Sequence, residues 1–174
     1  ATAYILHSDH RIYAASTADA SCTSTPFAPN QMGLELFGMG FVSNAAGSAD
    51  ETLFIAGGSE LAIGSGRSTL AYMTTADWTI SGIGPVTGSP ELTGTGLAEL
   101  WGFFPDASPM AVRQIDKTNG GTLREIDVSV VDTSGFGGAQ AWAFAFWGGR
   151  YYIFYQGLLD TSTTTAGYKL PDLL

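Results

Sequence analysis

The densest group of residues that could do chemistry is the stretch "LHSDH", residues 6–10. It places His7 and His10 three residues apart, with Asp9 between them. Neutral imidazole and carboxylate groups are common ligands of zinc and other transition metals. Two histidines at this spacing do not complete a zinc site, because a catalytic metal needs a third protein ligand. The competing interpretation is that Ser8, Asp9 and His10 form a plain hairpin turn.

Acidic residues elsewhere in the chain supply candidates for the third ligand. We expect it from Glu35, Glu91 or Asp132, which would join His7, Asp9 and His10 in activating a water molecule. General acid–base use of the histidines is a further alternative. Carboxylates around a channel could instead hold calcium, which takes six to eight oxygen ligands, but no calcium-loop motif is present. The cofactor that the sequence suggests is therefore a divalent metal, zinc or calcium.

Sugar chemistry has its own candidates. A glycosidase needs two acids about 5–9 Å apart, and Glu91, Glu99 and Asp132 are the acids that we consider for such a pair. Trp78 and Trp142 are candidate substrate-binding residues, and Trp78 is expected at the edge of a strand, where its ring could stack on a glycan. The chain contains no G-x-S-x-G elbow and no glycine-rich loop that leads into a helix, so the usual serine-hydrolase and phosphate-loop patterns are absent.

Composition narrows the class of protein. The chain has 174 residues, 45% of them hydrophobic, with 23 glycines and a net charge of −9. Only seven lysines and arginines are present, which argues against a nucleic-acid partner, because phosphate must be neutralised by cations. No apolar run approaches the ~18 residues of a membrane-spanning helix, and no signal peptide is visible at the start. Cys22 has no partner for a disulfide and is expected to be a small buried residue.

The aromatic stretch "AWAFAFWGGRYYIFYQ", residues 141–156, indicates a β-hairpin. Two short runs rich in strand-forming residues flank Gly148 and Gly149, a pair typical of tight hairpin turns. Because apolar residues occupy both faces of each run, we expect strands that are covered on both sides. The aromatic side chains are then core between packed sheets rather than a ligand platform.

The same unit recurs along the chain. "LFGMGFVS" leads to "TLFIAGG", and "ELTGTG" leads to "ELWGFFP", while "TAYILHSD" at the start matches the second member alone. More polar strands follow each pair. Four strands per unit at a period of about 40–50 residues predict an all-β, β-propeller-like fold. The small, glycine-rich first strands fit inner positions, where neighbouring backbones crowd around an axis.

Four blade-like units are expected, over residues 1–35, 36–86, 87–131 and 132–174. The first and last are incomplete, because the chain begins at a second strand and ends near a third. Unpaired end strands are adhesive edges, so the ring closes either within one chain or between chains. We favour self-association into a homo-oligomer, with a homodimer as the simplest form.

In such a propeller, two sets of loops open on the same face. These are the loops between second and third strands and the loops between successive blades. The first set carries His7, Asp9, His10, Glu60, Asp106 and Asp160. The second carries Asn30, Gln31, Glu35, Glu91 and Asp132. Both histidines are therefore expected on one face, although the opposite loops also carry acids.

Several motifs together resemble a known group of proteins. "STADASCTSTPFAPNQ", "FGMGFVS", "ELTGTG", "LWGFF" and "AWAFAFWGG…YYIFY" are similar to uncharacterised large secreted or lipid-anchored β-propeller-like repeat proteins of myxobacteria. The resemblance covers most of the chain and implies a bacterial, extracytoplasmic propeller. It carries over no catalytic residue. This chain departs from the group by being shorter and by the added stretch "GSELAIGSG" between two strands.

Two functions follow as hypotheses. The first is an extracytoplasmic propeller module that binds a small-molecule ligand, a glycan or a protein partner through its loop face. The second is a metal-dependent hydrolase of esters, lactones or phosphotriesters, with its site on the same face. The binding module does not require a complete set of metal ligands and catalytic groups, so we take it as the leading hypothesis.

Overall fold

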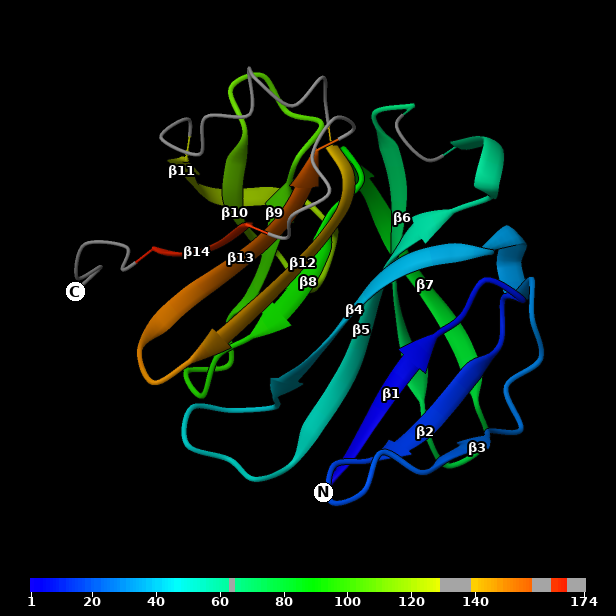
Figure 1. Ribbon diagram of the computed structural model, residues 1–174. Coiled ribbons are helices and arrows are strands. Elements are labelled where there is room, and N and C mark those ends of the chain that lie inside the picture. Colours follow the sequence, from blue (N-terminus) through cyan, green and yellow to red (C-terminus); the bar gives the residue numbers. More distant parts are fainter. Residues whose placement is uncertain (63–64, 129–138, 158–163, 169–174) are drawn as a thin grey trace.

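The computed structural model describes residues 1–62, 65–128, 139–157 and 164–168 (Figure 1). This part of the chain is all β, and its helical content is limited to two 3-10 turns, η1 (Gln31–Gly33) and η2 (Glu60–Ala62). Within these residues no helix has the length and apolar character needed to cross a bilayer. The prediction of an all-β protein is confirmed.

The strands form four separate antiparallel sheets, which we name blades A to D in chain order. Blade A contains β1 (Thr2–Leu6), β2 (Ile12–Ser16) and β3 (Cys22–Ser24). Blade B contains β4 (Leu36–Ser43), β5 (Glu51–Gly58), β6 (Arg67–Thr74) and β7 (Thr79–Thr87). Blade C contains β8 (Glu91–Gly94), β9 (Leu100–Phe104), β10 (Ala111–Ile115) and β11 (Thr122–Asp127). Blade D contains β12 (Ala139–Trp147), β13 (Arg150–Gly157) and β14 (Thr164–Tyr168).

The first strands of blades B, C and D are the inner strands. β8 lies between β4 and β12, and Figure 1 shows the three side by side near the middle of the molecule. Gly38 and Gly40 of β4 lie so close to the backbone of residues 90–93 that a Cβ on either would collide with it. Gly94 of β8 faces the backbone of Phe41 in the same way. The prediction that small residues allow inner strands to crowd together is confirmed.

Apolar side chains fill the spaces between successive blades. Alternate residues of a strand point to opposite faces, so one strand contributes to two cores. On β5, Leu53 and Ile55 pack toward blade A, whereas Phe54 and Ala56 pack toward blade C. Three buried clusters follow from this alternation, one each between blades A and B, B and C, and C and D.

The aromatic hairpin of blade D forms where the sequence predicts it. The expectation that both faces of its strands are covered is wrong for the described residues, because Ala143 and Ala145 are exposed on the face opposite the core. Gly148 and Gly149 both adopt positive φ, 59° and 75°, as a tight turn between β12 and β13 requires. Phe144 stacks on Tyr151 with ring centroids 5.4 Å apart, and Tyr151 in turn contacts Trp101 of blade C. These rings are therefore core between blades. Trp147, at the hairpin tip, is 75% exposed and does not share that role.

A recurring aspartate organises the turns between third and fourth strands. In each of blades A, B and C, an aspartate accepts hydrogen bonds from the backbone N–H and the hydroxyl of the residue two positions later, at 2.6–3.1 Å. Hydrogen bonds from Thr79 and Thr118 are the main cause of a lowered pKa for Asp77 and Asp116. The pKa of Asp19 is lowered first by the Ser16 hydroxyl and then by the bonds from Ser21. The pairs are Asp19 with Ser21, Asp77 with Thr79, and Asp116 with Thr118.

Among the described residues, blades A and D have three strands each, whereas blades B and C have four. Within the described residues blade A has no strand inside β1, and blade D ends its sheet at β14. One expectation is wrong: Cys22 is exposed rather than buried, because β3 is the outermost strand of blade A and all three of its residues face solvent.

Candidate functional site

A cavity of about 470 Å³ lies where the four blades converge. Its walls come from residues 4–6 of β1, 36–39 of β4, 89–91 at the start of β8, and 141–142 of β12. Most of these side chains are apolar. A concave apolar space with few polar groups is the usual form of a small-ligand site.

Glu91 supplies the carboxyl group of this cavity, and among the described lining residues it is the one acid. It is the first residue of β8, where the neighbouring β4 approaches at Gly38. Burial raises the pKa of Glu91 from its ordinary 4.5 to about 7, and a hydrogen bond from the Met39 backbone N–H opposes part of this shift. Near neutral pH the group therefore exists in both protonation states.

The aromatic residues of the cavity are Tyr4 and Trp142. Tyr4 is held by an edge-to-face contact with Trp78, with ring centroids 5.2 Å apart at 89°. Ser68 also lines the cavity, but its hydroxyl donates to the carbonyl oxygen of Gly88 at 2.7 Å. The walls can thus cover an apolar ligand, while Glu91 can accept a hydrogen bond or pair with a cation.

The "LHSDH" stretch forms the turn between β1 and β2 and lies outside this cavity. Asp9 accepts hydrogen bonds from the Tyr13 hydroxyl at 2.8 Å and the Arg11 backbone N–H at 3.1 Å. The Tyr13 hydrogen bond is the main cause of a lowered pKa for Asp9. His7 Nδ1 lies 3.5 Å from Asp9 Oδ1, whereas His10, at φ 60°, points away to another loop.

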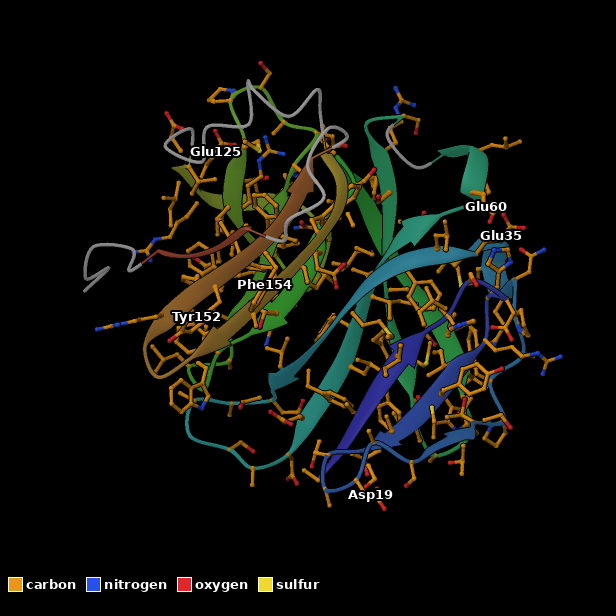
Figure 2. All side chains as sticks on the ribbon, in the orientation of Figure 1. Asp19, Glu35, Glu60, Glu125, Tyr152 and Phe154 are labelled. Atoms are coloured by element: carbon orange, nitrogen blue, oxygen red, sulfur yellow. The ribbon has the colours of Figure 1, made fainter. Side chains whose placement is uncertain are left out.

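His10 pairs with Glu60 rather than with Asp9. The distance from His10 Nε2 to Glu60 Oε1 is 2.9 Å, and the Glu60 backbone N–H donates to Glu35 Oε2 at the same distance. Three loops therefore meet at one end of blades A and B, as their predicted placement on one face requires. Figure 2 shows Glu35 and Glu60 together at this end and Asp19 at the opposite end. In the part of the chain that the structure describes, no three His, Cys, Asp or Glu residues are grouped to hold a metal ion.

The structure thus brings together two of the residues singled out from the sequence, Glu91 and Trp142, at the cavity. His7, Asp9, His10 and Glu35 belong to the loop cluster, and Asp132 and Asp160 lie outside the described residues. Trp78 is 7% exposed inside the core between blades A and B, so the expectation of an open ring at a strand edge is wrong.

Glu91 and Glu99 are too far apart to act as a glycosidase pair. Glu99 follows β8 at its other end, where its backbone carbonyl pairs with Thr95 and its side chain accepts from the Trp101 indole at 3.1 Å. Thr95, the residue beside Glu99, is four positions beyond Glu91 along the chain. At the usual rise per strand residue, this places the two ends about 13 Å apart. The known separations are about 5–9.5 Å.

Sequence reasoning missed the apolar walls, namely Tyr4, Leu6, Leu36 and Met39. These residues share a position on strand edges that face the central axis. That position could be recognised only once the arrangement of the blades is known.

These features define a β-propeller-like protein with a cavity at the convergence of its inner strands. No protein-family model and no curated protein sequence matches the chain. A solved structure of an engineered GH43 glycoside hydrolase, with both endo-xylanase and exo-arabinofuranosidase activity, is similar to it with a TM-score of 0.60 and 10% identity. The likeness covers 94% of this chain and 38% of that chain, and at this identity it supports the shared fold alone.

Proposed function

We propose that the protein is an extracytoplasmic, propeller-type binding module that holds a small ligand in the cavity between its inner strands. The observation that carries the proposal is the Glu91 carboxyl among apolar walls. A buried carboxylate is costly unless it is paired, so a ligand that offers a cation or a hydrogen-bond donor gains from meeting it there.

The chemistry of the cavity predicts which classes of ligand should bind more tightly than others. A cation with an apolar body satisfies both the carboxylate and the walls, and aromatic faces such as those of Tyr4 and Trp142 also favour cations. A neutral sugar can use the carboxyl as a hydrogen-bond partner. An anion is repelled once Glu91 is ionised, so binding of anions should weaken as pH rises through about 7.

A titration with three probes tests the proposal. Benzylammonium, xylobiose and benzoate are titrated at pH 8 and followed by ligand-observed NMR. We expect affinity to fall in that order. Ala141→Phe fills the cavity from β12, whereas Ala143→Phe changes an exposed alanine on the same strand that does not line it. Binding should disappear in the first variant and persist in the second. Absence of binding by all three probes, or equal binding to both variants, would refute the proposal.

A second candidate function is hydrolysis. The raised pKa of Glu91 favours it, because a carboxyl that keeps its proton near neutral pH can act as a general acid. A metal-dependent hydrolase would need a group of metal ligands, and among the described residues no three His, Cys, Asp or Glu residues are grouped to hold a metal ion. An aryl glycoside, a lactone and a phosphotriester would each be assayed with wild type and Glu91→Gln. Turnover that the variant loses, in the absence of added metal, would favour this candidate over binding alone.

Localisation outside the cytoplasm and self-association belong to the same proposal. The first rests on the resemblance to secreted repeat proteins. The second is supported by the outer face of blade D, where Ala143 and Ala145 are exposed, and where Tyr152 and Phe154 alternate with the core residues Tyr151 and Ile153 (Figure 2).

A further inference from the structure

A second hollow, which we name the side groove, lies between blade B and the β10–β11 turn of blade C. Its volume is about 480 Å³. Among the described residues it shares no lining residue with the cavity that contains Glu91. Its walls are formed by Thr52 and Phe54 of β5, Tyr72 of β6, Gly82 and Ile83 of β7, and Lys117 and Thr118 of the turn.

The side groove begins where blade C stops covering one face of blade B. Leu70 and Tyr72 are two residues apart on β6, so their side chains point to the same face. Leu70 is fully buried in the core between blades B and C, whereas Tyr72, the ladder partner of Phe54, is 39% exposed. A Cβ on Gly82 would point to Met32, so β7 is bare on the groove side. The tyrosine ring is therefore accessible from the groove.

The β10–β11 turn brings a cation to this ring. The carboxylate of Asp116 accepts from the backbone N–H and hydroxyl of Thr118 and from the Asn119 amide, which fixes the turn and satisfies the aspartate. The ammonium group of Lys117 lies 6.0 Å from the centre of the Phe54 ring. The ion pairs in the described part of the chain involve other residues, so this charge is available to a ligand.

Two hydroxyl groups of the wall are set as hydrogen-bond acceptors. Thr52 donates its hydroxyl proton to Asn44 Oδ1 at 2.7 Å, and Thr118 donates its own to Asp116 Oδ1 at 2.6 Å. A hydroxyl has one proton to donate and two lone pairs that accept. Each threonine oxygen can therefore still accept a hydrogen bond from a ligand that carries hydroxyl groups.

These three features together select one class of ligand. The ammonium group favours an anion, and a carboxylate makes a charge-assisted hydrogen bond with it. The two acceptors favour hydroxyl donors, and the exposed aromatic ring favours a ligand with a flat apolar face. A neutral sugar leaves Lys117 without a partner, whereas an aromatic acid leaves the threonine oxygens without donors. A sugar that carries a carboxylate satisfies all of them.

We propose that the side groove is a binding site for an acidic sugar. The carboxylate pairs with Lys117, the ring lies over Tyr72, and the sugar hydroxyls donate to Thr52 and Thr118. The inference does not depend on the proposed function, because it concerns a different site. The central cavity disfavours anions once Glu91 is ionised, so the two sites would select ligands of opposite charge.

An NMR titration of isotope-labelled protein with matched sugars tests the inference. Methyl glucuronide carries a carboxylate where methyl glucoside carries a hydroxymethyl group, and benzoate carries a carboxylate without hydroxyl groups. At pH 7 and low salt we expect the glucuronide to bind about three- to fivefold more tightly than either, the gain of a solvent-accessible ion pair. The amide signals that shift should include those of Tyr72, Lys117 and Thr118.

Four variants separate this site from unspecific attraction of an anion. Lys117→Gln should bring the affinities of the two sugars within about 1.5-fold of each other, since the ion pair is lost, and Lys117→Arg should keep the preference. Arg67→Gln removes the same charge from an exposed position of β6 that does not line the groove, and it should also keep the preference. Tyr72→Ala should weaken both sugars together.

Several outcomes would overturn the inference. These are absence of glucuronide binding, equal affinity for glucuronide and glucoside, a preference that Lys117→Gln retains, and benzoate binding as tight as that of the glucuronide. Ala141→Phe, which fills the central cavity, should leave glucuronide binding unchanged, and its loss there would assign the sugar to that cavity instead. If benzylammonium fails to bind while the glucuronide binds as described, the proposed function fails and this inference stands.

Discussion

Gly94 of β8 lies directly against the carbonyl group of Phe41 in β4, although the two strands belong to different sheets. The contact is backbone to backbone, and nothing larger than hydrogen fits between the two residues. At the centre of the molecule the inner strands therefore approach one another through glycines, whereas large apolar side chains fill the spaces between successive blades.

Replacing Gly94 should therefore be costly. In Gly94→Ala the new methyl group collides with the Phe41 carbonyl and the Val42 Cα, and neither backbone atom can move without shifting β4. We expect a loss of about 1–3 kcal/mol, the range for overpacked cores. Gly96→Ala is the matched control, because a Cβ there meets no atom within 4 Å. Urea unfolding measures both, and equal stabilities for the two variants would contradict the close approach.

Stability should fall as pH rises from about 4.5 to about 7. Burial raises the pKa of Glu91 from 4.5 to about 7, so the folded state holds a proton that the unfolded state releases. The stabilisation is fully present below pH 4.5 and is lost through pH 7, a change of about 3 kcal/mol. Glu91→Gln should remove this slope, and Glu51→Gln, at an exposed glutamate, should retain it. A slope that persists in Glu91→Gln would assign it to another group.

The turn aspartates should have the opposite effect to Glu91: they should make the stability of the fold decrease as the pH falls into the acid range. Hydrogen bonds from Thr79 lower the pKa of Asp77, so its stabilising effect is present above the ordinary value of 3.8 and is lost as pH falls through the lowered pKa. Asp77→Asn keeps an acceptor oxygen but does not titrate. We expect its unfolding to depend less on pH below 4 than that of the wild type, and parallel acid titrations would disprove this.

The histidines of the β1–β2 turn are the test of the metal hypothesis. The structure joins His10 to Glu60 across two blades, and both groups have solvent access, so His10→Ala should cost about 0.2–1 kcal/mol. We expect elemental analysis of untagged protein to give the same metal content for wild type, His7→Ala and His10→Ala. Stoichiometric zinc or calcium that both variants lose would instead support a metal site at this turn.

Self-association should depend on the uncovered face of blade D. Phe154 points away from the core that Tyr151 and Ile153 form with blade C. We expect light scattering to show a dimer for wild type and a monomer for Phe154→Lys. Trp147→Lys, at the exposed hairpin tip, is the control and should stay dimeric. A monomeric wild type would make the proposed association wrong.

Much of the architecture could be read from the sequence because each blade is encoded locally. The glycines of "GMG", the Gly148–Gly149 turn and the two aromatic strands are short-range signals, and each forms at its expected place. Of the two glycines in "TGTG", Gly94 lies against β4 as expected, whereas Gly96 follows the strand and meets no neighbouring atom. The strand bounds agree to within a few residues in blades B, C and D. These features depend on neighbours in the chain, which a linear pattern records.

The site was harder to predict because it depends on contacts between blades. "LHSDH" is conspicuous in the sequence, yet its His10 pairs with a glutamate fifty residues away. Trp78 follows a turn, but the positive φ of 61° directs its ring into the core rather than outward. Glu91 was one candidate among several acids. Its distinction, burial beside Met39 and the inner strands, is created only when four blades converge.

The order of strands within each sheet also has a consequence for how the chain reaches this fold. Every described ladder joins strands that follow one another in sequence. The turn aspartates stabilise the outer hairpins through hydrogen bonds between residues at most three positions apart in the chain. A blade can therefore assemble from a continuous stretch before its neighbours exist, which keeps the entropy of loop closure low. We expect folding to proceed blade by blade from the amino terminus during synthesis, with docking of the glycine-rich inner strands as the late step.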